Sequence, residues 1–322
     1  MAEVYKQPFF TVIVPVYNKE PYIQRSINSV LNQTFQDFEL IIVCDPSTDN
    51  SNAEVEKFTD HRIRVFHRDQ PGPGGYAARN LAISKANGKW IVFLDADDMY
   101  YPEHLKSFWA LSKKYPNEKL LASAKMIDEN GDVALDKFSA VQTDQSKVFS
   151  IEDYLRFSVV SDKPFNMNSV GIHSSLIENK KLFPEGRASR SGDIYTWVHL
   201  TFRAKKFVWS SHTGSHTYKD VVGVSKSNVP SMSLNHQMVR ELRDGCNYEE
   251  FLWLKKYANR LIRTAFFEQK KMNGKVEMGL LNAFYWRNDI AFCMFWLGLS
   301  LLPMQVITVL RKLKKALNEY KI

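Results

Sequence analysis

The stretch Trp90–Asp98, WIVFLDADD, decides the fold. Its first five residues are apolar and rich in aromatic and β-branched side chains, which predicts a short buried strand. The acidic sequence DADD follows directly, so the strand delivers carboxylates to a rigid position. Mg²⁺ and Mn²⁺ prefer oxygen ligands and take only one or two from a protein when phosphates complete the shell. An isolated DxD is more often an acidic surface turn, but the buried strand before it and polar residues at other strand ends favour a metal site.

Strands and helices alternate before this stretch. Apolar runs predict three earlier strands, at Phe9–Val16, Phe38–Val43 and Ile63–His67. Apolar residues at helical spacing predict helices from about Pro21, over Asn52–Phe58 and over Tyr76–Ala86. Because strands and helices alternate in units of about 30 residues, we expect an α/β fold with a doubly wound, mainly parallel sheet.

Polar residues follow these strands where a parallel sheet binds its ligands, beyond the carboxyl ends. Tyr17 and Asn18 follow the first predicted strand, and Asp45 follows the second. Arg79 lies one turn inside the helix after the loop 70–75, where a guanidinium can pair with phosphate or stack on a base. Taken alone, Asp45 is better explained as a turn residue, and Arg79 equally well as a solvated helix charge. Together with the DxD sequence, they predict one nucleotide crevice.

The pattern after Pro102 is less regular. It predicts helices over Glu103–Lys114, Ile151–Val159 and Ser191–Arg203, and strands over Leu120–Ile127, Phe207–Trp209 and His216–Tyr218, with a hairpin turn at Glu129–Asp132. Asp193, at the start of a predicted helix, is the second catalytic candidate; the alternative is an acid that stabilises the helix N-terminus.

Charge and cysteine content narrow the function classes. The 322 residues carry a net charge of +8, and residues 236–322 hold 15 Lys and Arg against 8 Asp and Glu, so most of the excess lies there. No nucleic-acid reader motif accompanies it, so we expect no nucleic-acid partner. Cys44, Cys246 and Cys293 form no CxxC pair, which argues against a zinc cluster or a disulfide framework. Met1–Gln7 lacks the apolar core of a signal peptide, and free thiols are typical of the cytoplasm.

The basic C-terminal region predicts contact with a membrane. Glu249–Lys271 has an apolar stripe with interleaved Lys and Arg, which indicates an amphipathic basic helix. Ile290–Leu310 contains no charged residue, and the basic segment Arg311–Lys315 follows it. Because Pro303 interrupts this stretch and cations flank both ends, we expect two helices lying on the anionic cytoplasmic face of the membrane. The alternatives are a spanning helix and a helical cap on the soluble domain.

The N-terminal third resembles the family 2 glycosyltransferases, which have the GT-A fold. Six segments carry the resemblance, in the same order and spacing over about Phe10–Pro102. They are Val12–Asn18 (VIVPVYN), Ser29–Thr34 (SVLNQT), Asp45–Ser51 (DPSTDNS), Ala78–Asn80 (ARN), Ala86–Lys89 (ANGK) and Phe93–Asp98 (FLDADD).

The resemblance implies roles for individual residues. Asp95 would contact the ribose or the diphosphate, Asp97 would bind Mn²⁺ or Mg²⁺, and Asp193 would be the catalytic base. Five residues would hold the nucleotide, most often a uridine diphosphate: Pro15, Val16, Tyr17, Asp45 and Arg79.

The sequence departs from the family pattern at three places. Gly192 stands where a glutamate usually precedes the base, and Cys44 stands where the family has an acid after the second strand. The family's histidine after a Tyr-Arg pair is absent, since Asp220 and Val221 follow Tyr218-Lys219; His216 is the candidate substitute ligand.

The sequence therefore predicts a GT-A glycosyltransferase domain over 1–235 and a helical, basic, membrane-associating region over 236–322. The domain would have a nucleotide half of about 1–102 and an acceptor half of about 103–235. The expected reaction is inverting, metal-dependent transfer of a sugar from a nucleotide diphosphate sugar, UDP-linked, to a hydroxyl of a glycan or lipid-linked saccharide, as in surface polysaccharide or glycoconjugate assembly.

Two alternatives remain open. A sugar nucleotidyltransferase also uses a doubly wound sheet and metal-binding carboxylates, but it normally carries a Gly/Arg/Lys-rich phosphate loop where this chain has Pro15–Asn18. A catalytically degenerate GT-A scaffold would not need intact Asp95, Asp97 and Asp193.

Overall fold

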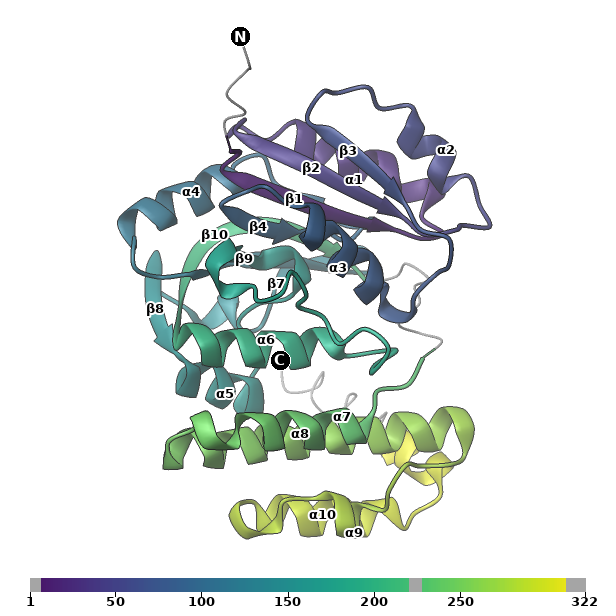
Figure 1. Cartoon of the computed structure of the whole chain (residues 1–322). Coiled ribbons are helices and arrows are strands. Elements are labelled where there is room, and N and C mark those ends of the chain that lie inside the picture. The colour runs from purple at the N-terminus through teal and green to yellow at the C-terminus, as the bar shows by residue number, and fades with distance from the viewer. Residues whose placement is uncertain (1–6, 220–227, 311–322) are drawn as a thin grey trace. The chain divides into compact units, whose positions relative to one another are not determined.

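The computed structural model describes residues 7–219 and 228–310, and the chain divides into two compact units, Met1–Lys226 and Ser227–Ile322 (Figure 1). The domain boundary expected after residue 235 falls within helix α7 (Met232–Leu242) of the second unit. The basic segment Arg311–Lys315 and the pair Asp220-Val221 lie outside the described residues.

One mixed sheet forms the centre of the first unit. Its strands are β1 (Phe10–Val16), β2 (Phe38–Cys44), β3 (Ile63–His67), β4 (Trp90–Phe93), β5 (Met99–Tyr100), β6 (Leu120–Glu129), β7 (Asp132–Leu135), β8 (Ser146–Ser150), β9 (Val170–His173) and β10 (Lys206–Tyr218). They are hydrogen-bonded in the order β3-β2-β1-β4-β9-β6-β10-β5, with β7 paired to β6 and β8 to β10. The pairs β3–β2, β2–β1, β1–β4 and β6–β10 are parallel, which confirms the predicted α/β fold with a mainly parallel sheet.

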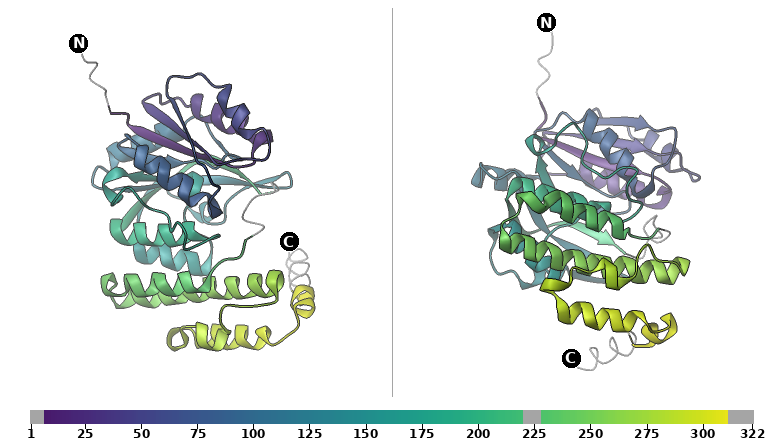
Figure 2. Two further views of the ribbon diagram at one scale, coloured as in Figure 1. Left: turned by 45° about the vertical axis from the view of Figure 1, so that its right-hand side comes forward. Right: turned by 60° about the horizontal axis from the view of Figure 1, so that its bottom comes forward.

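Helices cover both faces of the first half of the sheet (Figures 1 and 2). The helices of this unit are α1 (Glu20–Leu31), α2 (Ser51–Glu56), α3 (Tyr76–Lys85), α4 (His104–Lys114), α5 (Ile151–Val160) and α6 (Gly192–Ala204). The even-numbered residues of β1, such as Val12 and Val14, share one buried core with Ile27 of α1. On the other face, Phe93 of β4 contacts Trp197 of α6, with 6.3 Å between the ring centroids.

Parallel pairing brings the carboxyl ends of β1, β2 and β4 to the same end of the sheet. Phe10 lies opposite Phe38 and Val16 opposite Cys44, so β1 and β2 end level with each other. Every residue of β2 is buried, as expected of a parallel strand covered on both faces. The polar residues that follow these strands therefore start from neighbouring positions.

The second half of the sheet differs from the sequence prediction. Strand β9 has no predicted counterpart; it is four residues long and runs antiparallel between β4 and β6. Its Gly171 has a packing reason, since a Cβ there would lie 2.9 Å from the Phe108 ring. The two strands predicted at Phe207–Trp209 and His216–Tyr218 are parts of one strand, β10, whose register shifts between Ser210 and Ser215.

The second unit is helical. Its α-helices are α7, α8 (Tyr248–Asn273), α9 (Leu280–Ala283) and α10 (Ile290–Ser300). Helix α8 contains the predicted amphipathic helix and begins with a capping box of Asn247 and Glu250. Helices α7 and α8 lie side by side (Figure 2).

The apolar C-terminal stretch is broken where the sequence predicts. Helix α10 ends at Ser300, and residues 304–310 are helical again, so the interruption includes Pro303. Over residues 7–219 and 228–310, no helix combines the length and the apolar character needed to cross a bilayer.

His104, at the start of α4, is a buried histidine whose ring packs against Tyr100 and Phe108. Neither of its ring nitrogens has a hydrogen-bond partner among the described residues. Burial, and next the nearby His212, lower the pKa of His104 from 6.5 to about 3. Between about pH 3 and pH 6.5, His104 is therefore protonated in the unfolded chain and neutral in the folded chain.

We therefore expect acidification below pH 6.5 to destabilise the protein by up to about 1.4 kcal/mol per pH unit through His104 alone. His104→Leu should flatten this part of the acid dependence, measured by urea unfolding between pH 7 and pH 4. His61→Leu, at a side chain that is 91% exposed, controls for the added apolar group. An unchanged acid slope in His104→Leu would contradict the prediction.

Candidate active site

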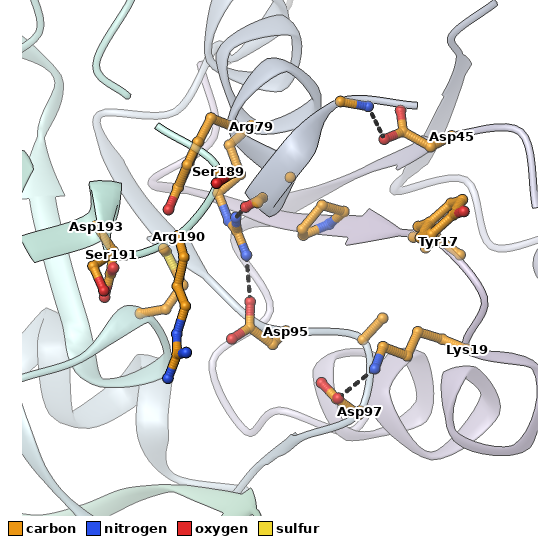
Figure 3. A pocket seen from close by; sticks show the side chains of 18 residues that line it. Tyr17, Lys19, Asp45, Arg79, Asp95, Asp97, Ser189, Arg190, Ser191 and Asp193 are labelled. Atoms are coloured by element: carbon orange, nitrogen blue, oxygen red, sulfur yellow. Dashed lines mark hydrogen bonds and ion pairs between the residues drawn. The ribbon is translucent and has the colours of Figure 1, made fainter. Parts of the chain in front are cut away.

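A cavity of about 350 Å³ lies beyond the carboxyl ends of β1 and β4 (Figure 3). All eight site residues predicted from the sequence line it: Pro15, Val16, Tyr17, Asp45, Arg79, Asp95, Asp97 and Asp193. The lining also includes polar residues that the sequence did not single out: Lys19, Tyr76, Ser189, Arg190 and Ser191. Residues far apart in the chain therefore meet in one site.

The carboxylate of Asp45 is bonded to protein donors. Arg68 Nη1 donates to Asp45 Oδ1 at 2.6 Å, and the amide of Gly72 donates to Oδ2 at 3.2 Å. These bonds fix the start of the loop 70–75, here called the glycine loop, against the end of β2. A direct contact between Asp45 and a nucleotide stays a prediction.

Cys44, which stands at the family's acidic position, is buried at the end of β2. Burial, followed by the charges of Glu56 and Asp45, raises the pKa of the Cys44 thiol to about 12. The thiol is therefore neutral near pH 7 and does not replace the missing acid.

Arg79 bridges the end of β4 and the glycine loop. Its Nη2 donates to Asp95 Oδ1 at 2.5 Å, and its Nη1 donates to the carbonyl of Gly74 at 2.8 Å. The Arg79 side chain is only 8% exposed, so it is not a solvated helix charge. Burial raises the pKa of Asp95, the Arg79 charge opposes that rise, and the Asp97 charge adds to it.

Asp97 pairs with an ammonium group that sequence reasoning missed. Lys19 Nζ lies 2.6 Å from Asp97 Oδ2, and the two side chains are 13% and 19% exposed. The backbone of Lys19 is fixed in turn, because its amide donates to Ser51 Oγ at 2.6 Å. In the sequence, only the position of Lys19 directly after Tyr17-Asn18 at the end of the first strand could have indicated that it belongs to the site.

Asp98 and Asn168 hold the acidic segment Asp95–Asp98 in place. The oxygens of Asp98 accept hydrogen bonds from the Tyr218 amide at 2.8 Å and from Asn168 Nδ2 at 2.5 Å. Asn168 Oδ1 in turn accepts from the Asp95 amide at 2.8 Å. Burial, and then the charges of Asp95 and Asp97, raise the pKa of Asp98 well above its ordinary value. These roles depend on long-range contacts that leave no local pattern in the sequence.

Asp193 lies in the first turn of α6, on the side of the cavity away from Tyr17 and Asp97 (Figure 3). The positive end of the helix dipole favours a negative charge at this position. Arg190 and Ser191 precede it, and Ser191 adopts a left-handed conformation with φ 62° that turns the chain into the helix.

Metal-ligand side chains are sparse around the cavity. Within the part of the chain that the structure describes, no three His, Cys, Asp or Glu side chains converge as a metal cluster. His216, the candidate substitute ligand, does not line the cavity. Its Nδ1 lies 3.0 Å from Tyr101 Oη, and its Nε2 lies 3.5 Å from Asp128 Oδ2.

Comparison with known proteins gives the class. The sequence model of glycosyl transferase family 2 matches residues 11–136. A protein of Methanocaldococcus jannaschii, described as an uncharacterized glycosyltransferase, is 31% identical over 210 residues, which is 62% of this chain and 67% of the relative. The chain therefore belongs to glycosyltransferase family 2.

Two further proteins resemble parts of the chain. The Escherichia coli UDP-Glc:alpha-D-GlcNAc-diphosphoundecaprenol beta-1,3-glucosyltransferase WfgD is 35% identical over 132 residues, 41% of this chain and 51% of that protein. The structure of S. aureus TarS 1–349 with UDP-GlcNAc superposes with a TM-score of 0.71 at 22% identity, covering 85% of this chain and 79% of that one. This likeness confirms the GT-A fold. Several other matching glycosyltransferases are longer, and this chain spans 24–30% of their length.

Proposed function

We propose that this protein is an inverting, metal-dependent glycosyltransferase. It moves a sugar from a UDP-sugar to a hydroxyl of a glycan or of a lipid-linked saccharide. The observation that carries the proposal is the cavity in which the strand-end carboxylates Asp95 and Asp97 lie apart from Asp193 at a helix start. That arrangement provides one region for a diphosphate and another for a base, and family membership supports the reaction class.

Asp193 is the base of the proposed reaction. Its carboxylate takes the proton from the acceptor hydroxyl as the acceptor oxygen attacks the anomeric carbon. The attack comes from the face opposite the diphosphate, so the anomeric configuration inverts. The residues that hold the nucleotide fix the position of that carbon, and such positioning supplies much of the rate.

The residues present fit a divalent cation. Asp97 lines the cavity and offers carboxylate oxygens, the donors that Mn²⁺ and Mg²⁺ prefer. One or two protein carboxylates suffice when diphosphate oxygens complete the shell, so a larger ligand cluster is not required. When bound, the cation neutralises negative charge on the leaving diphosphate. Lys19 and Arg79 lie at the same strand ends, where they pair with Asp97 and Asp95.

The donor and acceptor classes rest on the relatives. WfgD uses UDP-glucose and a diphosphoundecaprenol-linked acceptor, and TarS binds UDP-GlcNAc, as their descriptions state. We extend the UDP-sugar donor and a saccharide or lipid-linked acceptor to this chain. This chemistry belongs to the assembly of surface polysaccharides or glycoconjugates.

Asp97→Ala tests the metal assignment. We expect loss of Mn²⁺-dependent UDP binding and of Mn²⁺-dependent release of UDP from UDP-sugars, with the fold retained, because Asp97 is a strand-end ligand rather than a core residue. Calorimetric titration of UDP with and without Mn²⁺ measures binding, and circular dichroism checks the fold. Asp144→Ala, at a side chain that is 54% exposed, is the matched control. Full activity of Asp97→Ala with metal still required would refute the assignment.

Asp193→Asn tests the base. The amide keeps the shape of the side chain and removes its basicity, so we expect kcat to fall by about 10²-fold or more while UDP affinity changes little. Steady-state kinetics with a panel of UDP-sugars, together with UDP titration, separates the two effects. Weaker UDP binding with unchanged turnover of bound substrate would assign Asp193 a binding role instead.

We further propose that the second unit attaches the protein to the cytoplasmic face of an anionic membrane. Helix α10 supports this, because its exposed side chains are apolar. Ile290, Met294 and Phe295 are each 60% exposed, and Leu301 just beyond the helix is 81% exposed. Ile290 and Met294 are four residues apart and therefore lie on one stripe of the helix.

Helix α8 adds positive charge beside this apolar surface. The guanidinium of Arg263 lies 4.7 Å from the ring centroid of Trp296, and that of Arg260, which is ion-paired with Asp289, lies 3.5 Å from the centroid of Phe292. Lys270 Nζ donates to the carbonyl of Ser300 at 2.7 Å, at the end of α10. Apolar side chains bordered by cations complement an anionic lipid surface.

Charges placed on the exposed stripe test the attachment. We expect the double variant Met294→Glu, Phe295→Glu to bind vesicles of phosphatidylglycerol and phosphatidylethanolamine with a partition coefficient lower by about 10-fold or more, as measured by sedimentation. The added carboxylates disfavour insertion and are repelled by the anionic lipid. The matched control is Val133→Glu with Leu135→Glu in β7, where the side chains are 48% and 42% exposed. A wild-type chain that stays in the supernatant at low salt would refute the attachment. If the protein instead remains on cell membranes after an alkaline carbonate wash, a spanning helix is favoured.

A further inference from the structure

The residue before Asp193 has no room for a side chain. A Cβ at Gly192 would lie 2.7 Å from Pro184 Cγ and 2.8 Å from Tyr76 Cζ, which is closer than nonbonded carbon atoms approach. Gly192 has an ordinary negative φ, so the backbone does not require glycine there. The requirement comes from Pro184 and the ring of Tyr76, which together occupy the space beside the start of α6.

The hydroxyl of Tyr76 also caps the start of α6. The amide of Gly192 donates to Tyr76 Oη at 2.7 Å. The first amides of a helix have no partner within the helix, and the N-cap Ser191 makes no side-chain cap here. Tyr76, more than a hundred residues earlier, supplies the acceptor that a local cap would otherwise provide.

The Tyr76 ring is held on its other sides. It stacks on Phe183 with 6.0 Å between centroids and 13° between planes, and the residue is only 4% exposed. Gly74 has φ 68°, and a Cβ there would lie 2.5 Å from Tyr76 Cε2. Burial, and then the charge of Asp193, raise the pKa of Tyr76 to about 12, so the hydroxyl stays neutral.

Tyr76 and Arg79 belong to the same turn of α3. Arg79 reaches the strand-end carboxylate of Asp95, and Tyr76 reaches the amide next to Asp193. One helical turn therefore contacts both the region proposed for the diphosphate and the helix that carries the proposed base.

We infer that Tyr76 is a positioning residue that fixes Asp193 relative to Arg79 and Asp95, and that Gly192 is glycine because a side chain there would collide with the Tyr76 ring as well as with Pro184. This inference rests on the proposed function, since it concerns the base of that reaction. Asp193 directly follows the capped amide, so loss of the cap lets the first turn of α6 shift. Small displacements of a reacting group of about 1 Å can cost about 100-fold in rate.

Tyr76→Phe in the full chain removes the acceptor and keeps the ring. We expect kcat for release of UDP to fall by about 10-fold, with KM for the donor changed by less than about 2-fold. The donor is whichever of UDP-glucose, UDP-galactose and UDP-N-acetylglucosamine the wild type hydrolyses fastest with Mn²⁺. Hydrogen exchange, followed by mass spectrometry, should speed up in the peptide that contains Gly192 and Asp193.

Tyr100→Phe is the matched control. It also removes a buried tyrosine hydroxyl with a 2.7 Å bond, from Tyr100 Oη to the carbonyl of Phe93. We expect it to lower the melting temperature and to leave kcat and the exchange of the Gly192 peptide unchanged. If it lowers kcat as Tyr76→Phe does, the effect of Tyr76 is general destabilisation and the inference fails.

Gly192→Ala tests the space requirement. We expect it to lower kcat by about 10-fold or more in the wild type, and by less in a Tyr76→Ala background, where one of the two close contacts is gone. Equal effects in both backgrounds would refute the pairing of Gly192 with Tyr76.

Asp193→Asn, assayed in parallel, distinguishes the proposed base from the positioning role of Tyr76. If Asp193→Asn is fully active, the proposed base is wrong. If it is inactive while Tyr76→Phe matches the wild type in kcat and in exchange at Gly192, only the positioning role is overturned.

Discussion

Carboxylates crowd the carboxyl ends of β2 and β4, and the rest of the site depends on how their charge is compensated. Two unit charges 4 Å apart interact by about 4 kcal/mol at an effective dielectric constant of about 20, so uncompensated neighbours would repel strongly. Asp98 instead accepts two hydrogen bonds from distant segments. The other carboxylates pair with a cation each: Asp45 with Arg68, Asp95 with Arg79 and Asp97 with Lys19. Because the partners come from different segments, charge compensation draws the start of α1, the glycine loop and the end of β10 to one edge of the sheet.

The two sides of the cavity come from parts of the chain that are far apart in the sequence. The side with Tyr17 and Asp97 is built by β1, β2 and β4, which all lie within the first hundred residues, with β3 between β2 and β4 in the sequence. The side with Asp193 comes from α6, roughly a hundred residues later. Helix α3 joins the sides, since its first turn contacts both Asp95 and Gly192. The distance between the sides is therefore set by one rigid element rather than by two independent loops.

The sequence predicted the strand-end residues on the side of the cavity with Tyr17 and Asp97, because those residues are encoded locally. Strands such as β1 and β4 are continuous apolar runs, and the residues at their ends inherit their position from the sheet. Strand β9 escaped prediction because a strand of four residues carries little periodicity, and the continuity of β10 escaped because its middle, Ser210–Ser215, is polar and shifts in register. Lys19 and Tyr76 escaped for a different reason: each matters through a partner far away in the sequence, Asp97 and Gly192. Gly192 was noticed as a departure from the family pattern, yet its cause is visible only in three dimensions.

Strand β9 completes the ladder between β4 and β6, although the chain leaves β6 and returns only after residues 130–169. Asn168, near the end of that excursion, holds Asp95 and Asp98, but residues 130–165, which contain β7, β8 and α5, do not line the cavity. Insertions or replacements there leave the pairing of β1, β2 and β4 untouched. The architecture is thus modular in an evolutionary sense: a lineage can remodel residues 130–165 while it keeps Asn168 and inherits the strand-end chemistry unchanged.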